Sequence, residues 1–221
     1  MKIVCRPARH RSGKSLHLPR STRLGPLVVS DEVYHGLVYG GRAVSVLEST
    51  DTRGAAVLNG FSKLYAMTGW RLGYVIARPD LIRAMQKLQQ NFAISASAFV
   101  QRAGITALAE TAADVERMRR TYAERRRFML DALAARGLRV PVEPTGAFYV
   151  LVDFREHTSD SLALAYDILR TAHVAVTPGI DFGSNAEGYI RLSYATSVER
   201  IAEGIARLGR YVDGLRARLS F

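Results

Sequence analysis

The sequence predicts an α/β protein in which a mostly parallel sheet with helices is followed by a small α+β unit. The short apolar runs "PLVVSDEVY" and "AAVLNGFS" each end in polar residues, a pattern typical of buried parallel strands. Segments of helical periodicity come next, and strands alternate with helices near the C-terminus. The 221 residues suffice for one large domain or two small ones with a real hydrophobic core.

Three strands and three helices are expected in the first part of the chain. The first strand starts at Leu27, the second covers residues 55–62, and the third covers residues 70–77. Pro79 stops the third strand. The first helix, 79–92, has Pro79 and Asp80 in its first turn, as helix N-termini favour. A second helix is expected over 95–110 and a third over about 113–135, ending at Gly137. The third carries one apolar stripe: Val115, Met118, Tyr122, Met129 and Leu133.

The C-terminal part is expected to be a separate small domain. Residues 146–154 and 188–195 form strands, residues 160–172 form a helix between them, and residues 174–183 form a strand that leaves through a Pro-Gly turn. A last helix begins after Ser197, which caps it. The expected divisions are therefore a basic leader (1–26), a first domain (27–135) and a small α+β domain (136–221).

Charge and composition favour an ordinary globular protein of the cytoplasm. The net charge is +11, but residues 1–24 contain seven Lys and Arg and no acid. The rest of the chain has 31 − 7 = 24 basic and 20 acidic residues, or +4, so neither nucleic acid nor a membrane is the expected partner. No apolar segment reaches about 18 residues. Cys5 is the single cysteine, so a reducing compartment is the default. The leader lacks hydrophobic periodicity, and we expect it to be disordered.

Five chemically useful side chains follow the expected strands of the first domain. The first strand ends in Asp31 and Tyr34, the second ends in Ser62 and Lys63, and Arg71 follows a turn. In open α/β sheets, ligands bind outside the carboxyl ends of the strands. A carboxylate, a phenol, an amine, a hydroxyl and a guanidinium are thus expected at one edge of the sheet.

This set of groups suits pyridoxal 5'-phosphate. The aldehyde of this cofactor needs a lysine amine, and its ring nitrogen needs an anion to stay protonated. Its phenolic oxygen accepts a hydrogen bond from a hydroxyl, and its phosphate suits a hydroxyl and an arginine fork. Taken singly, each residue also has an ordinary structural interpretation; Lys63, for example, could be an exposed loop lysine. We assign no metal ligands.

The stretches "SDEVY", "SKLYAMTGWRLGY" and "GYIRLSYA" resemble signature segments of the class I/II aminotransferases, which are fold-type-I pyridoxal-phosphate enzymes. The resemblance runs from about residue 27 to the C-terminus. It implies a remnant of the family's large domain plus its small domain, and aminotransfer between an amino acid and a 2-oxo acid by a homodimer. It also implies that Lys63 holds the cofactor and moves the substrate proton, Asp31 pairs with the ring nitrogen, Tyr34 bonds the phenolic oxygen, and Ser62 and Arg71 hold the phosphate.

Arg191 is the expected anchor for the substrate α-carboxylate. The resemblance implies this role, and the strand pattern supports it. Tyr189, Arg191 and Ser193 share one face of a strongly apolar strand, and a buried arginine needs an anion. The alternative is that Arg191 lies on the wet face of a half-covered sheet. By family analogy alone, Phe148 and the loop 178–183 line the substrate side. His35 and Tyr65 receive only a structural interpretation.

The family's chain is normally longer at its N-terminus. We interpret the basic leader as the product of truncation or of a shifted reading frame, and we expect weak cofactor binding and low stability of this chain alone. Three alternatives to an aminotransferase stay open: another fold-type-I enzyme such as a β-lyase or synthase, a non-catalytic remnant, and a nucleic-acid-binding module that depends on the leader.

Overall fold

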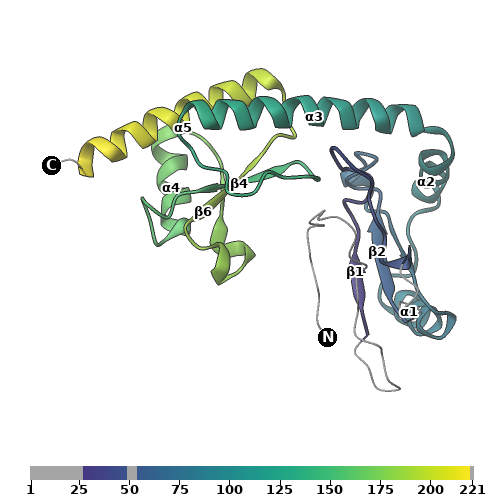
Figure 1. Ribbon diagram of the computed structural model, residues 1–221. Coiled ribbons are helices and arrows are strands. Elements are labelled where there is room, and N and C mark those ends of the chain that lie inside the picture. Colours follow the sequence, from purple (N-terminus) through teal and green to yellow (C-terminus); the bar gives the residue numbers. More distant parts are fainter. Residues whose placement is uncertain (1–26, 49–53, 220–221) are drawn as a thin grey trace. The chain divides into compact units, whose positions relative to one another are not determined.

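The computed structural model describes residues 27–48 and 54–219, and the predicted leader (1–26) lies outside these ranges (Figure 1). The chain forms two compact units, Met1–Arg117 and Met118–Phe221. The division falls inside the long helix α3 (Ala112–Ala135). The domain boundary that the sequence suggests, at 135/136, stays a prediction. The two units are described separately below.

The first unit contains a three-stranded sheet in the order β1-β2-β3. The strands are β1 (Val29–Asp31), β2 (Ala56–Gly60) and β3 (Gly73–Ile76). β1 and β2 are parallel, as expected, whereas β3 is antiparallel to β2. The connection 61–72 contains turns and one short 3-10 helix, η2 (Thr68–Trp70), rather than a crossover helix, so the chain returns along the strand that it has just left.

Two helices follow β3: α1 (Pro79–Phe92) and α2 (Ala98–Glu110). Pro79 is the first residue of α1, where its fixed φ fits and its missing N–H is not needed. A small core forms around Phe61, Met67 and Ala107. Gly104 of α2 allows close packing there, because a Cβ at this position would lie 2.5 Å from a methyl carbon of Leu72. The segment 61–72 is therefore held against α2.

α1 buries none of its residues within this chain, although its sequence is amphipathic. Phe92 at its end is 85% exposed, and Ile94 just beyond is 79% exposed. Leu81, Ile82 and Met85 of α1 are half-buried, so within the described residues its apolar side chains are only partly covered.

The second unit contains an antiparallel sheet in the order β4-β6-β5. Its strands are β4 (Tyr149–Asp153), β5 (Thr177–Pro178) and β6 (Tyr189–Ser193). Helix α4 (Ser161–Ala172) packs with β5 and β6 of this sheet, and helix α5 (Val198–Leu219) packs with α4 (Figure 1). Alternate strand residues are buried, as a sheet covered on one face requires. The largest fully buried side chains of this unit are Leu133, Val152, Phe154, Ile168, Ile190, Tyr194, Leu208 and Val212.

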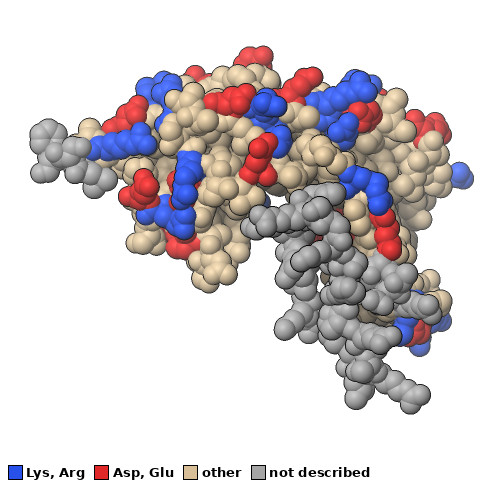
Figure 2. All heavy atoms as spheres, in the orientation of Figure 1, with Lys and Arg blue, Asp and Glu red and all other residues tan. Residues whose placement is uncertain are grey.

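Both helices of the second unit begin at residues with capping side chains. Asp160 accepts the N–H of Ala163 at 2.9 Å at the start of α4, and the Ser197 hydroxyl accepts the N–H of Arg200 at 3.4 Å at the start of α5. His173, the residue that follows α4, has a left-handed backbone conformation with φ 55°. In the described part of the chain, no helix is long and apolar enough to cross a membrane. Figure 2 shows Lys and Arg side chains interspersed with Asp and Glu on the face in view.

Candidate active site

The five residues predicted for the first domain lie at or beyond one edge of its sheet. Asp31 is the last residue of β1, and Lys63 follows the end of β2, which is parallel to β1. Arg71 precedes β3, which is antiparallel to β2, so the start of β3 is at the same edge. Gly60 pairs with Gly73 at this edge. The strand arrangement thus brings the segments with Asp31, Tyr34, Ser62, Lys63 and Arg71 to one place.

Lys63 and Tyr34 are near each other within this site. The Lys63 Nζ lies 5.7 Å from the centroid of the Tyr34 ring. The loops that carry them also touch, because a Cβ on Gly36 would lie 3.0 Å from a methyl carbon of Leu64. Gly36 has φ +91°, a conformation that L side chains rarely adopt. Glycine at this position therefore allows the amine and the phenol to approach.

The turn that carries Lys63 is fixed by hydrogen bonds on both sides. The Lys63 carbonyl accepts the N–H of Ala66 at 3.2 Å, and the Thr68 hydroxyl donates to the Ser62 carbonyl at 2.9 Å. The Met67 N–H donates to the carbonyl of Phe61, which is buried in the core against α2. The lysine thus belongs to an anchored turn, and its side chain is half-buried.

Arg71 and Ala66 both have left-handed backbone conformations, each with φ 53°. For a residue other than glycine this conformation costs about 1–2 kcal/mol. Such residues are common at binding sites. The Arg71 side chain is exposed, and its guanidinium donates to the Thr68 carbonyl at 3.0 Å. Thr68 therefore orients one end of the Arg71 guanidinium and also holds the turn that carries Lys63.

Asp31 itself is exposed, and its carboxylate accepts the N–H of Val33 at 3.2 Å. The neighbouring Glu32 has the structural role, because its side chain is only 10% exposed. Its Oε1 accepts the hydroxyls of Ser30 and Ser45 and the N–H of Val46, at 3.1, 3.1 and 2.8 Å. Sequence reasoning did not single out Glu32. Two of its partners are 13 and 14 residues away, and no local pattern indicates such contacts.

His35 and Tyr65 have the structural surroundings that the sequence suggested. The Nδ1 of His35 lies 3.6 Å from Glu32 Oε2, whereas the serine hydroxyls donate to Oε1. The Tyr65 ring packs against Phe61 with 5.3 Å between centroids, and burial raises the pKa of the Tyr65 phenol.

Arg191 belongs to the second unit. It alternates with the buried Ile190 and Leu192, so it lies on the less buried face of the sheet, as the alternative interpretation expected. Its Cζ lies 4.1 Å from the Tyr149 ring centroid and 4.7 Å from that of Phe182. Among the described residues, no carboxylate forms an ion pair with Arg191. These contacts are compatible with binding an external anion.

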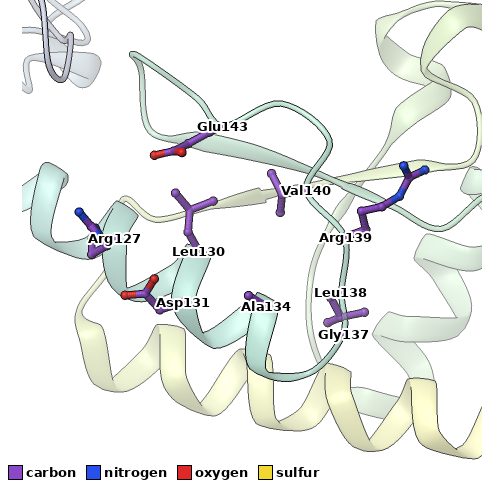
Figure 3. Close-up of a pocket in the computed structure, with 9 residues that line it drawn as sticks. All are labelled: Arg127, Leu130, Asp131, Ala134, Gly137, Leu138, Arg139, Val140 and Glu143. Carbon is purple, nitrogen blue, oxygen red and sulfur yellow. The ribbon is translucent and has the colours of Figure 1, made fainter.

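A cavity of about 600 Å³ lies elsewhere in the second unit. It is lined by the C-terminal part of α3 and the segment 137–143 (Figure 3). Two of its charged side chains are already paired: Glu143 with Arg126, and Arg139 with Asp153. None of the predicted site residues lines it. We therefore assign this cavity a structural origin.

Comparison with known proteins identifies the family. A family-wide sequence profile, "Aminotransferase class I and II", matches residues 19–208. The chain belongs to this family. The resemblance of "SDEVY", "SKLYAMTGWRLGY" and "GYIRLSYA" is thereby confirmed, and so is the α/β fold class that it implies, with part of the large domain present.

Individual relatives give the extent of the similarity. The chain is 44% identical over 190 residues to a (5-formylfuran-3-yl)methyl phosphate transaminase of Methanocaldococcus jannaschii, covering 85% of this chain and 50% of the relative. It is 40% identical to a valine–pyruvate aminotransferase of Mycobacterium tuberculosis, covering 84% and 48%. An aromatic aminotransferase structure from Pyrococcus horikoshii matches with a TM-score of 0.82 at 38% identity, covering 86% and 52%. The chain thus spans about half the length of these relatives.

Proposed function

We propose that this chain carries cofactor and substrate residues of a pyridoxal-phosphate-dependent aminotransferase, which moves an amino group between an amino acid and a 2-oxo acid. The observation that carries the proposal is the Lys63 amine, 5.7 Å from the Tyr34 ring centroid at the edge where Asp31 ends β1. Membership of the class I and II family supports the reaction class.

The side chains at this edge fit pyridoxal phosphate by their chemistry. Lys63 offers the amine for covalent attachment, Asp31 an anion for the ring nitrogen, and Tyr34 a hydroxyl for the phenolic oxygen. The Ser62 hydroxyl and the Arg71 guanidinium suit the phosphate. The Thr68 carbonyl accepts one N–H of Arg71 at 3.0 Å, and a guanidinium has five, so donors remain for an anion.

When bound, the cofactor supplies the electron sink for the reaction. The protein residues bind, orient and move protons. With the cofactor bound, the Lys63 amine would hold and move the proton of the substrate Cα, a role that requires an amine near the reacting atoms. Arg191 holds the α-carboxylate of the substrate through paired N–H donors. Asp31 keeps the ring nitrogen protonated by its negative charge.

The substrate side chain stays open. The related proteins named above include a transaminase of a furan phosphate, a valine–pyruvate enzyme and an aromatic enzyme, so family membership alone does not select one amino acid. We also propose a homodimer, a cytoplasmic location and a role in the biosynthesis or metabolism of amino acids, in line with the family resemblance and the single Cys5. Another fold-type-I enzyme, such as a β-lyase or synthase, is the second candidate, because it would use the same cofactor residues.

A cofactor titration followed by absorbance tests the proposal. At cofactor concentrations high enough to offset the weak binding expected of this chain, we expect a new band near the visible edge for the wild type. We expect none for Lys63→Ala or Lys63→Arg, since a guanidinium keeps the charge but loses the amine chemistry. Lys87→Ala is the matched control, because Lys87 is an exposed lysine on α1. A band that survives in Lys63→Ala, or that disappears in Lys87→Ala, would contradict the assignment. Product analysis with several amino acids separates aminotransfer from lyase or synthase chemistry.

A further inference from the structure

The Arg191 guanidinium is contacted by two aromatic rings, one from the neighbouring strand β4 and one from the 3-10 helix that follows β5. β6 is the central strand, with β4 on one side and β5 on the other. Tyr149 begins β4, and its ring centroid lies 4.1 Å from the Arg191 Cζ. Phe182 ends the 3-10 helix η3 (Gly179–Phe182) that follows β5, and its ring centroid lies 4.7 Å from the same atom. Contacts at these distances attract a cation to the ring face.

The ring contacts leave the hydrogen-bonding capacity of the guanidinium almost unused. To the residues that the structure describes, Arg191 donates one hydrogen bond, from a terminal nitrogen to the Thr177 hydroxyl at 3.2 Å. Thr177 is its direct neighbour in the antiparallel pair of β5 and β6. The ring contacts are not conventional hydrogen bonds, so the other donors remain for a flat anion such as a carboxylate.

Both rings are themselves held in place. The Tyr149 ring packs on Phe148 at 4.7 Å between centroids. The segment with Phe182 is fixed through its backbone: a Cβ on Gly179 would lie 1.9 Å from a backbone carbonyl oxygen, and the Ile180 N–H donates to the Ser161 hydroxyl at 3.1 Å. Ser161 is fully buried. Phe182 is nevertheless 48% exposed, so packing of its own side chain is not what places it.

We propose that Tyr149 and Phe182 are positioning residues, whose rings hold the Arg191 guanidinium in the orientation that receives the substrate carboxylate. This inference rests on the function proposed above. A long arginine side chain loses considerable rotamer entropy when it binds an anion. Contacts with two rings restrict the side chain before the carboxylate arrives, so less freedom is lost on binding.

The test measures both the guanidinium and its ligand by NMR, with pyruvate as the probe. In the wild type, the Nε–H resonance of Arg191 should show a ring-current shift and should move on titration with pyruvate; Arg191→Lys assigns the resonance. Tyr149→Leu and Phe182→Leu should each reduce this ring-current shift and weaken pyruvate binding about 3- to 10-fold. Tyr149→Phe keeps the ring and should stay within about twofold of the wild type.

Tyr166→Leu is the matched control, because Tyr166 on α4 also contacts an arginine, at 5.9 Å from the Arg170 Cζ, but away from this site. Unchanged pyruvate affinity in both ring variants, or no response of Arg191 to pyruvate in the wild type, would overturn the inference. If Arg191→Lys binds pyruvate as well as the wild type does, Arg191 is not the carboxylate anchor and the positioning role fails with it. The cofactor titration on Lys63 is independent of all these outcomes.

Discussion

Asp153 provides a pH-dependent contribution to the stability of the second unit. Its side chain is only 4% exposed and accepts a two-pronged hydrogen bond from the Arg155 guanidinium, at 3.0 and 2.7 Å. Arg139 pairs with the same carboxylate. The hydrogen bonds from Arg155 are the largest influence on the pKa of Asp153, which falls from 3.8 to about 2. We predict that Asp153→Asn destabilises the protein at neutral pH.

The size of the effect follows from that pKa. A fall from 3.8 to about 2 corresponds to roughly 2.4 kcal/mol, at about 1.36 kcal/mol for each tenfold change in proton affinity. The side chains of Arg139 and Arg155 are 62% and 53% exposed, so solvent screens part of this energy. We therefore expect a loss of about 1–2 kcal/mol in the free energy of unfolding of Asp153→Asn.

The sign of the pH dependence is fixed by the lowered pKa. The folded state binds the proton less tightly than the unfolded state, so the ion pair contributes fully above the unfolded pKa near 3.8. This contribution is lost as the pH falls from there toward about 2. The difference between wild type and Asp153→Asn should shrink over the same window. At neutral pH the difference in the free energy of unfolding between wild type and Asp153→Asn should have its full value.

Urea unfolding of both proteins, followed by circular dichroism from about pH 7 to pH 2, measures this difference. Asp131→Asn removes an exposed carboxylate on α3 and serves as the control. A difference that stays constant down to about pH 2 would refute the reasoning, because an uncharged Asp153 would then stabilise as well as a charged one. So would a control variant with the same pH profile.

Three further substitutions test the supports of the two sites. Glu32→Ala should cost about 2–3 kcal/mol in urea unfolding, because it leaves two serine hydroxyls and an N–H without their acceptor; a loss below about 0.5 kcal/mol would contradict this. Gly36→Ala should weaken pyridoxal phosphate binding more than Gly40→Ala, since both have positive φ but only Gly36 touches a neighbouring side chain; equal losses would argue against the close approach. Gly179→Ala should lower the free energy of unfolding by about 3 kcal/mol and reduce the ring-current shift at Arg191; a ring-current shift equal to that of the wild type would show that the loop does not place Phe182.

Much of the secondary structure could be predicted from the sequence, since local signals decide it. The proline at position 79 and the periodicity after it predicted a helix over 79–92, and α1 is Pro79–Phe92. The pairing of β3 was not predicted, because the strand direction depends on the route of the connection 61–72 and not on the strand residues. The strand expected over 174–183 is reduced to Thr177–Pro178, because the chain turns into η3 at Gly179.

The candidate site was predictable at the level of residues and only in part at the level of contacts. Strand-end positions indicated Lys63 and Tyr34, and these two side chains are near each other. The supporting role of Glu32 and the contact of Phe182 with Arg191 were not predicted. Both join residues that are distant in sequence, and such contacts depend on how loops close rather than on local patterns.

The most direct measurement reduces a mixture of the protein and pyridoxal phosphate with borohydride and then maps the labelled peptide. We predict that the cofactor is found on Lys63, at a concentration where Lys87 is not labelled. Label on other lysines with Lys63 unmodified, under conditions in which the absorbance band has formed, would contradict the assignment of this turn as the cofactor site.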